Sequence, residues 1–92
     1  MPDRKPLPAL TRYRNRSGHS GVRAYTLLGD GIVVEFHTGA LYLYGHRRPG
    51  AATVTRMKSL ARGGRGLSTF ISQHVAGEYE ARFVDGAWLG IP

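Results

Sequence analysis

The chain has no cysteine and no long apolar run among its 92 residues. Without cysteine, neither disulfides nor thiolate-bound metal ions can hold the fold together, so its stability must come from packing. No apolar stretch approaches the ~18 residues that span a bilayer, and the N-terminal MPDRKPLPAL carries charges and prolines where a signal peptide needs an apolar run. These absences predict a single cytoplasmic domain with one modest core and no membrane partner.

Acidic residues are scarce, because 6 Asp and Glu face 13 Lys and Arg, which gives a formal net charge of +7. Eleven of the cations are arginine, whose guanidinium makes bidentate contacts with phosphate and stacks on bases. Glu78, Glu80 and Asp85 all come late in the chain, so the positive charge belongs mainly to the part before residue 77. This balance favours a polyanionic partner, and the alternative is charge that serves only solubility.

Turn signals divide the middle of the chain into strands. Asp30-Gly31 and Thr38-Gly39 are both hairpin signals, because glycine adopts a positive φ at little cost. The β-branched and aromatic residues around them predict a three-stranded antiparallel meander over residues 22–28, 32–37 and 41–44.

The position of the second turn sets the predicted register of the meander. With Thr38-Gly39 as a two-residue turn, Val34 faces Leu43, and Glu35 faces Tyr42 on the other side of the sheet. Tyr42 and Tyr44 are then predicted to lie on the less apolar face.

Two later segments, residues 51–61 and 67–75, place apolar residues at helical spacing, with His74 on the apolar side of the second. Pro49 precedes the first helix, and Gly63-Gly64 ends it. A three-stranded sheet needs such a cover, because its apolar face is not stable in water. After residue 77, apolar alternation and Asp85-Gly86 predict a further hairpin. The expected fold class is α+β, a three-stranded antiparallel meander packed on two helices, with a candidate C-terminal β-hairpin.

We divide the chain into a flexible basic N-terminal arm over residues 1–20, an α+β domain over residues 21–76 and a strand or hairpin extension over residues 77–92. Arg12, Arg14 and Arg16 alternate around Tyr13 in the arm. In an extended segment these arginines point the same way, which suits a phosphate backbone; the alternative is a solvated tail.

The order of aromatic, glycine and proline positions resembles the KTSC domain, a small domain found at the C-terminus of some lysyl-tRNA synthetases and as stand-alone proteins. The resemblance covers roughly residues 21–75 and departs from the family pattern at Arg48, Arg62 and Gly66-Leu67. The resemblance implies an α+β fold, and the association of the family with lysyl-tRNA synthetases suggests nucleic-acid binding. The residues that carry it are Tyr25, Ile32, Val34, Phe36, Gly39, Tyr42, Tyr44, Pro49, Gly64 and Ile71.

A nucleic-acid site is predicted from the two sheet tyrosines and the surrounding cations. Tyr42 and Tyr44 lie two residues apart on one strand, where they can stack successive bases, although aromatic residues also serve strands simply as packing. The cations would form a rim that follows the phosphates, and the alternative is a solvated helix face. These cations are Arg47, Arg48, Lys58, Arg62 and Arg65, with Arg12, Arg14 and Arg16 of the arm in support.

No motif for catalysis or cofactor binding is visible. The loop Arg62-Gly63-Gly64-Arg65-Gly66 lacks the Lys-Ser/Thr of a P-loop, and the four histidines show no metal-ligand spacing. We therefore expect a protein that binds and does not catalyse, with no cofactor and no metal ion. The predicted function is nucleic-acid binding of low sequence specificity, with single-stranded DNA or RNA as the favoured partner. The alternative is a protein-interaction or assembly module, in which exposed aromatics such as Trp88 make a homo-oligomer contact.

Overall fold

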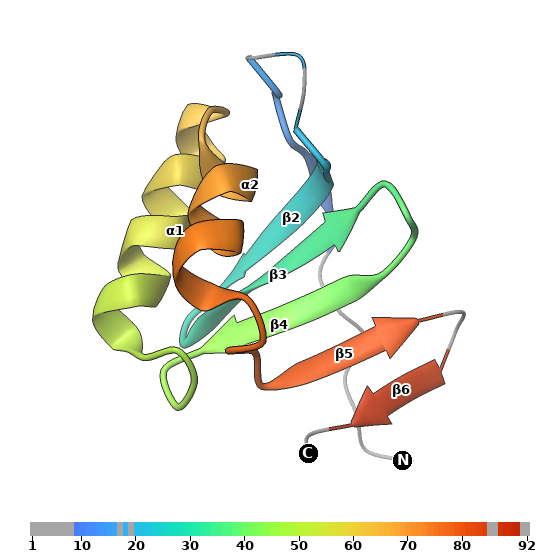
Figure 1. Cartoon of the computed structure of the whole chain (residues 1–92), viewed down its shortest axis with the longest axis vertical. Coiled ribbons are helices and arrows are strands. Elements are labelled where there is room, and N and C mark those ends of the chain that lie inside the picture. The colour runs from blue at the N-terminus through green and yellow to red at the C-terminus, as the bar shows by residue number, and fades with distance from the viewer. Residues whose placement is uncertain (1–8, 17, 19, 85–86, 91–92) are drawn as a thin grey trace.

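The computed structural model of the chain describes residues 9–16, 18, 20–84 and 87–90, with side chains described through residue 83. The fold is α+β, with one antiparallel sheet whose strands follow the chain order and with helices on one of its faces (Figure 1). The strands are β1 (Thr11–Arg12), β2 (Val22–Leu28), β3 (Gly31–Phe36), β4 (Leu41–Gly45), β5 (Ala81–Val84) and β6 (Ala87–Gly90).

The predicted three-stranded meander corresponds to β2, β3 and β4, but the sheet is 6-stranded. β1 pairs with β2 at one edge, and β5 pairs with β4 at the other. β5 and β6 fall where a C-terminal hairpin was predicted, and they pair with each other and continue the sheet beyond β4. The three-strand prediction was wrong because it left both edges of the meander without hydrogen-bond partners, and the flanking segments supply them.

Helix α1 (Ala51–Gly63) ends at Gly64, which adopts a φ of 74° and donates its N–H to the carbonyls of Ala61 and Leu60. Helix α2 (Leu67–Phe70) continues directly into a π-helix, η1 (Ile71–Val75). Ile71 and Val75 of η1 are buried, whereas His74 is exposed and its ring lies 4.7 Å from that of Phe70. The prediction of His74 on the apolar side was wrong: Leu67, Ile71 and Val75 are buried at intervals of four residues, and His74 lies outside this line with its ring against that of Phe70.

The β3–β4 loop differs from the predicted turn by one residue. The N–H of Phe36 donates to the carbonyl of Ala40 at 2.9 Å, so three residues, His37 to Gly39, form the loop. Gly39 adopts a φ of 94°, as the last residue of a three-residue hairpin loop commonly does. A one-residue change of register moves every side chain of a strand to the opposite face. Val34 therefore faces Tyr42, Ile32 faces Tyr44, and the tyrosines lie on the apolar face.

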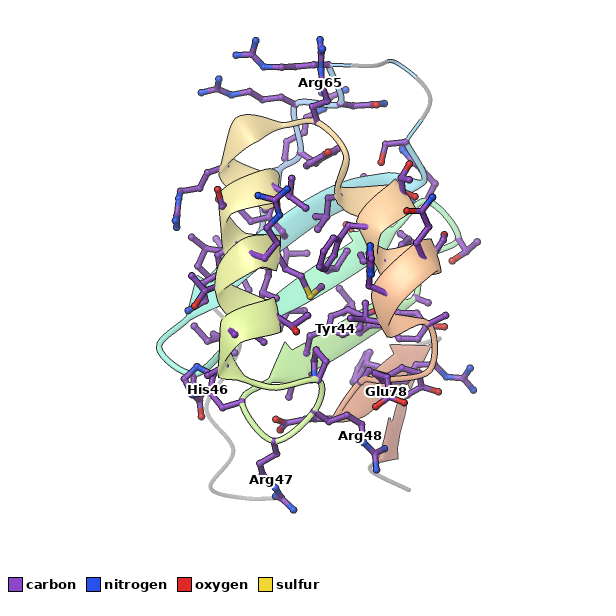
Figure 2. The ribbon with its side chains drawn as sticks, turned by 60° about the vertical axis from the view of Figure 1, so that its left-hand side comes forward. Tyr44, His46, Arg47, Arg48, Arg65 and Glu78 are labelled. Atoms are coloured by element: carbon purple, nitrogen blue, oxygen red, sulfur yellow. The ribbon has the colours of Figure 1, made fainter. Side chains whose placement is uncertain are left out.

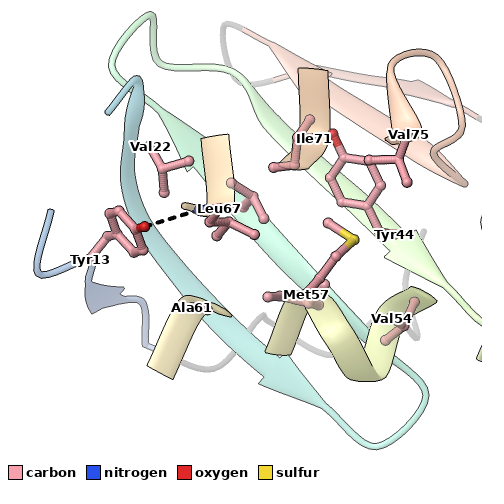
Figure 3. Packing of buried hydrophobic residues seen from close by; sticks show 11 residues of the cluster. Tyr13, Val22, Tyr44, Val54, Met57, Ala61, Leu67, Ile71 and Val75 are labelled. Carbon is pink, nitrogen blue, oxygen red and sulfur yellow. Dashed lines mark hydrogen bonds between the residues drawn. The ribbon is translucent and has the colours of Figure 1, made fainter. Parts of the chain in front are cut away.

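The core lies between this apolar face and the helices (Figure 3). Ile32, Met57 and Leu67 are fully buried and come from the sheet, α1 and α2 in turn. The buried cluster consists of Tyr13, Val22, Ile32, Val34, Tyr44, Val54, Met57, Ala61, Leu67, Ile71 and Val75.

Part of the segment predicted as an arm is built into this fold. Tyr13 is 3 % exposed, and its hydroxyl accepts the backbone N–H of Leu67 at 3.2 Å. The N–H of Arg16 donates to the carbonyl of Gly64 at 2.7 Å. The N-terminal segment therefore packs across the start of α2, because a single buried tyrosine gives an otherwise polar segment a place in the core. Residues 1–8 of the predicted arm lie outside the described residues.

Candidate functional site

The predicted tyrosine platform is wrong, because both rings face the helices. Tyr44 is 2 % exposed and lies against Ile71 and Val75 (Figure 3). Burial raises the pKa of its hydroxyl above the ordinary value, and the neighbouring Tyr42 and Tyr79 raise it further. Tyr44 therefore cannot receive a base from solvent.

Tyr42 is half-buried and is held between two other rings. Its centroid lies 5.4 Å from that of Phe36 and 4.9 Å from that of Tyr79, with interplanar angles of 88° and 77°. Edge-to-face contacts of this kind fix the orientation of an aromatic side chain. Tyr42 and Tyr44 also lie nearly parallel, 6.3 Å apart, so one aromatic cluster extends from the core towards the surface.

The predicted basic rim is divided between two ends of the molecule. Arg47 and Arg48 lie at the end opposite Arg65 (Figure 2). The first two belong to the loop between β4 and α1, whereas Arg62 and Arg65 flank the glycines between α1 and α2. A rigid 13-residue helix separates the two groups, so they cannot line one short groove.

Lys58, the remaining member of the predicted rim, has a structural contact. Its Nζ donates to the carbonyl of Leu28 at 2.6 Å and reaches that of Gly29 at 3.5 Å. The ammonium therefore joins α1 to the β2–β3 turn and is half-buried there. Its charge is directed at backbone carbonyls of the turn and not at a ligand.

Acidic groups accompany the arginines of the β4–α1 loop. The backbone N–H of Arg47 donates to Oε2 of Glu80 at 3.1 Å. The backbone N–H of His46 donates to the main-chain carbonyl of Asp30 at 3.2 Å, which places the turn that carries Asp30 beside this loop. Glu78 lies at this same end (Figure 2). The positive potential of Arg47 and Arg48 is therefore reduced by nearby carboxylates.

The opposite end collects exposed arginines from distant parts of the sequence, and we call Arg14, Arg16, Arg62 and Arg65 the arginine end. The chain crossing at Gly64 brings them together, through its hydrogen bond with Arg16. A Cβ placed on Gly64 would lie 2.6 Å from the Cβ of Arg14, which shows how closely the two segments approach. Three acidic residues belong to the other end, namely Asp30, Glu78 and Glu80. None of these three lies beside the arginines of the arginine end.

A hollow of about 620 Å³ opens beside the arginine end, and we call it the arginine hollow. Arg12 and Arg14 line it from the N-terminal segment, and Arg23 lines it from β2. Nη2 of Arg23 donates to the carbonyl of His37 at 3.0 Å, which holds the guanidinium near the β3–β4 loop. The full lining of the arginine hollow is Leu10, Arg12, Tyr13, Arg14, Asn15, Val22, Arg23, Ala24, Glu35 and His37.

Sequence reasoning missed Arg23, although the order Val22-Arg23-Ala24, with a charge between two apolar residues at the start of a predicted strand, was a signal for it. Arg23 stands between Val22 and Ala24, which are both buried, whereas its own side chain is exposed. Glu35, which also lines the arginine hollow, is the one carboxylate among its lining residues. The net charge of the hollow is still positive, since three guanidinium groups face one carboxylate.

A second hollow, of about 420 Å³, lies between the sheet and η1, and we call it the aromatic hollow. Phe36, Tyr42 and Tyr79 contribute aromatic rings to its lining. His37 lines both hollows, so they meet at the β3–β4 loop, where the arginine hollow extends towards Glu35 on the outer face of the sheet and the aromatic hollow lies on the helix side. The full lining is Gly21, Phe36, His37, Thr38, Tyr42, Tyr44, Ile71, Ser72, Ala76, Gly77 and Tyr79.

The described ranges contain neither a cluster of metal-ligating residues nor a helix able to span a membrane. No group of three or more histidines and carboxylates in these ranges is placed to hold a metal ion. None of the helices described is long and apolar enough to span a bilayer. The linings of the two hollows offer guanidinium groups and aromatic rings.

Comparison with known proteins gave no match, neither to a protein-family model, nor to a curated protein, nor to a solved structure. The resemblance to the KTSC domain thus stays a prediction from the sequence.

Proposed function

We propose that the protein binds nucleic acid with low sequence specificity and favours single strands. The observation that carries the proposal is the convergence of exposed arginines from three separate segments on the arginine end and the arginine hollow. Guanidinium groups attract phosphates whatever the base sequence, and this electrostatic attraction supplies most of non-specific binding.

The preference for single strands is supported by the aromatic hollow beside the arginines. Proteins that bind single strands combine a cationic surface for the backbone with aromatic side chains for the bases. The family resemblance contributes only the association with tRNA synthetases, because the tyrosines that carry the resemblance lie on the core side of the sheet.

The decisive experiment compares two double variants that remove the same charge from opposite ends of the molecule. Arg14→Gln with Arg65→Gln changes the arginine end, and Arg47→Gln with Arg48→Gln is the matched control. Binding of labelled single-stranded DNA, RNA and duplex is measured by fluorescence anisotropy at several salt concentrations. For single strands, the logarithm of the association constant falls with the logarithm of salt by ~0.7 for each phosphate neutralised.

We expect the arginine-end variant to bind more weakly and to lose ~0.7 of this slope for each contact removed, whereas the control keeps most of both. Equal losses from the two variants would mean that net charge alone attracts the strand. Binding that is absent at low salt, or that does not respond to salt, would contradict the function itself.

An assembly module is the second candidate, and the outer sheet face favours it. Leu41 and Leu43 lie half-buried on the side of the sheet away from the helices, opposite Glu35 and Val33. The side chain of Trp88, which was predicted to join such a contact, lies outside the described part of the chain. Sedimentation of the wild type and of Leu41→Ser tests this candidate, since a subunit contact on this face would dissociate on substitution.

A further inference from the structure

We propose that the aromatic hollow receives one unstacked base of a bound single strand. The proposal rests on the proposed function and extends it, because it assigns the base contact to a site separate from the arginines. It replaces the predicted platform of Tyr42 and Tyr44 with an open recess whose lining includes the rings of Phe36, Tyr42 and Tyr79.

The walls of the aromatic hollow suit a flat, weakly polar ring. Phe36 and Tyr79 each contact Tyr42 edge to face, at centroid distances of 5.4 and 4.9 Å. These contacts hold the three rings in place before any ligand arrives, so little ordering is needed on binding. Ile71, which is 7 % exposed, adds an aliphatic surface from η1. Unstacked bases pack on aromatic side chains in this way in many single-strand complexes.

Polar groups are few and lie in the lining next to the rings. Ser72 and Thr38 contribute hydroxyl groups, and His37 contributes an imidazole. A hydroxyl both donates and accepts hydrogen bonds, and an imidazole can do either, so these groups can pair with the edges of different bases. A recess of about 420 Å³ falls within the usual range for small-molecule sites. Its chemistry therefore fits a nucleobase with little discrimination among the four.

The position of His37 connects this recess to the phosphate contacts. His37 lines both hollows, and its carbonyl accepts a hydrogen bond from Nη2 of Arg23 at 3.0 Å. A strand whose phosphates follow Arg12, Arg14 and Arg23 would reach the aromatic hollow by turning around the β3–β4 loop at His37, because the arginine hollow extends to the outer side of the sheet. This continuity favours a base of the same strand over an unrelated apolar ligand as the occupant.

The test separates base binding from phosphate binding. Affinities are measured for an oligothymidylate and for an abasic strand of the same length, which keeps the phosphates and lacks the bases. Stacking of one base by aromatic side chains is worth ~1–3 kcal/mol, which corresponds to about 5- to 150-fold in affinity. We expect the wild type to bind the oligothymidylate tighter by a factor in this range.

Two variants locate the base. Ser72→Leu places a larger side chain in the aromatic hollow, and Gln73→Leu is the control, because Gln73 is also exposed on η1 but is not among the lining residues. Tyr79→Leu removes one ring from the wall. We expect Ser72→Leu and Tyr79→Leu to bring the ratio of the two affinities close to one while abasic binding is unchanged, and Gln73→Leu to keep the wild-type ratio.

The possible failures are distinguishable. If neither strand binds the wild type, the proposed function fails along with this inference. If both strands bind the wild type equally, or if Ser72→Leu leaves the ratio unchanged, the base lies elsewhere and the inference is overturned, while phosphate binding by the arginines stands. The aromatic hollow would then be left to another occupant, such as an apolar side chain of a protein partner.

Discussion

Gly64 lies where the N-terminal segment crosses the junction of α1 and α2, and it serves both segments. Its N–H caps α1, and its carbonyl accepts the N–H of Arg16. Its φ of 74° is a conformation that side chains with a Cβ adopt only with strain. The backbone at this one position therefore sets the arrangement of the arginine end.

At the scale of this residue, Gly64→Ala is expected to lower the free energy of unfolding by about 1–2 kcal/mol or more. The left-handed conformation is strained for alanine, and the added Cβ would lie 2.6 Å from that of Arg14. Urea denaturation measures the change. Gly63→Ala is the matched control, because Gly63 ends α1 with open space around it, and alanine there should be neutral or stabilising by up to ~1 kcal/mol. Similar losses from both substitutions would contradict the role given to Gly64.

Single residues also explain where sequence reasoning fails. The strands around the β3–β4 loop follow from alternation and propensity, but whether two or three residues form the loop depends on which of His37 and Thr38 begins it. Both loop lengths are common in hairpins and both use glycine. The choice decides the faces of Tyr42 and Tyr44, so the predicted platform failed although the strands were right.

At the scale of the elements, α1 is attached to the sheet at two levels. Val54, Met57 and Ala61 bury its apolar side, as the helical spacing predicted. Lys58 adds a polar attachment at the β2–β3 turn. The first contact could be read from periodicity, whereas the second depends on where a distant turn lies in three dimensions, which no local pattern records.

Replacing Lys58 with methionine is expected to lower the free energy of unfolding by about 1 kcal/mol, because a hydrogen bond from a charged donor is lost at a half-buried site. Nucleic-acid affinity should change no more than loss of one general charge requires. Arg56→Met, on the exposed side of the same helix, removes the same charge and should leave stability within ~0.5 kcal/mol of the wild type. Chemical denaturation and anisotropy titrations of both variants measure these effects. A larger loss of nucleic-acid affinity from Lys58→Met than from Arg56→Met would mean that Lys58 contacts the nucleic acid.

The π-helix shows the same limit at the end of the second helix. Periodicity predicted a helix over residues 67–75, and α2 with η1 occupies that range. Leu67, Ile71 and Val75 are buried at the spacing that the sequence indicated, whereas His74 is exposed against the prediction. The existence of the helix and its main buried positions were readable from the sequence, and the change to π geometry was not.

At the scale of the whole molecule, the N-terminal segment belongs to the folded unit. Tyr13 fills a core position, and β1 covers the edge of β2. A chain of this length has little surplus stability, because a small domain buries a limited fraction of its surface. Sequence reasoning could not find this, since one tyrosine among arginines and prolines gives no periodic signal.

A chain that begins at Ser20 is therefore expected to unfold at markedly lower urea concentration than the full chain, or to lack a cooperative transition. Loss of a buried aromatic side chain alone costs ~3–5 kcal/mol. Circular dichroism during denaturation measures this, and Tyr13→Ala in the full chain should reproduce most of the loss. Wild-type stability of the shortened chain would show that residues 21–76 and the C-terminal hairpin suffice without Tyr13.

The arginine end is cationic, whereas Glu78 and Glu80 offset the charge of Arg47 and Arg48 at the opposite end, so the described part of the molecule has an electric dipole moment along its length. A polyanion approaching from any direction exerts a torque on such a dipole and turns the cationic pole towards itself. Encounters then begin with the correct pole forward, so the fraction of collisions that lead to capture rises above what random tumbling would give.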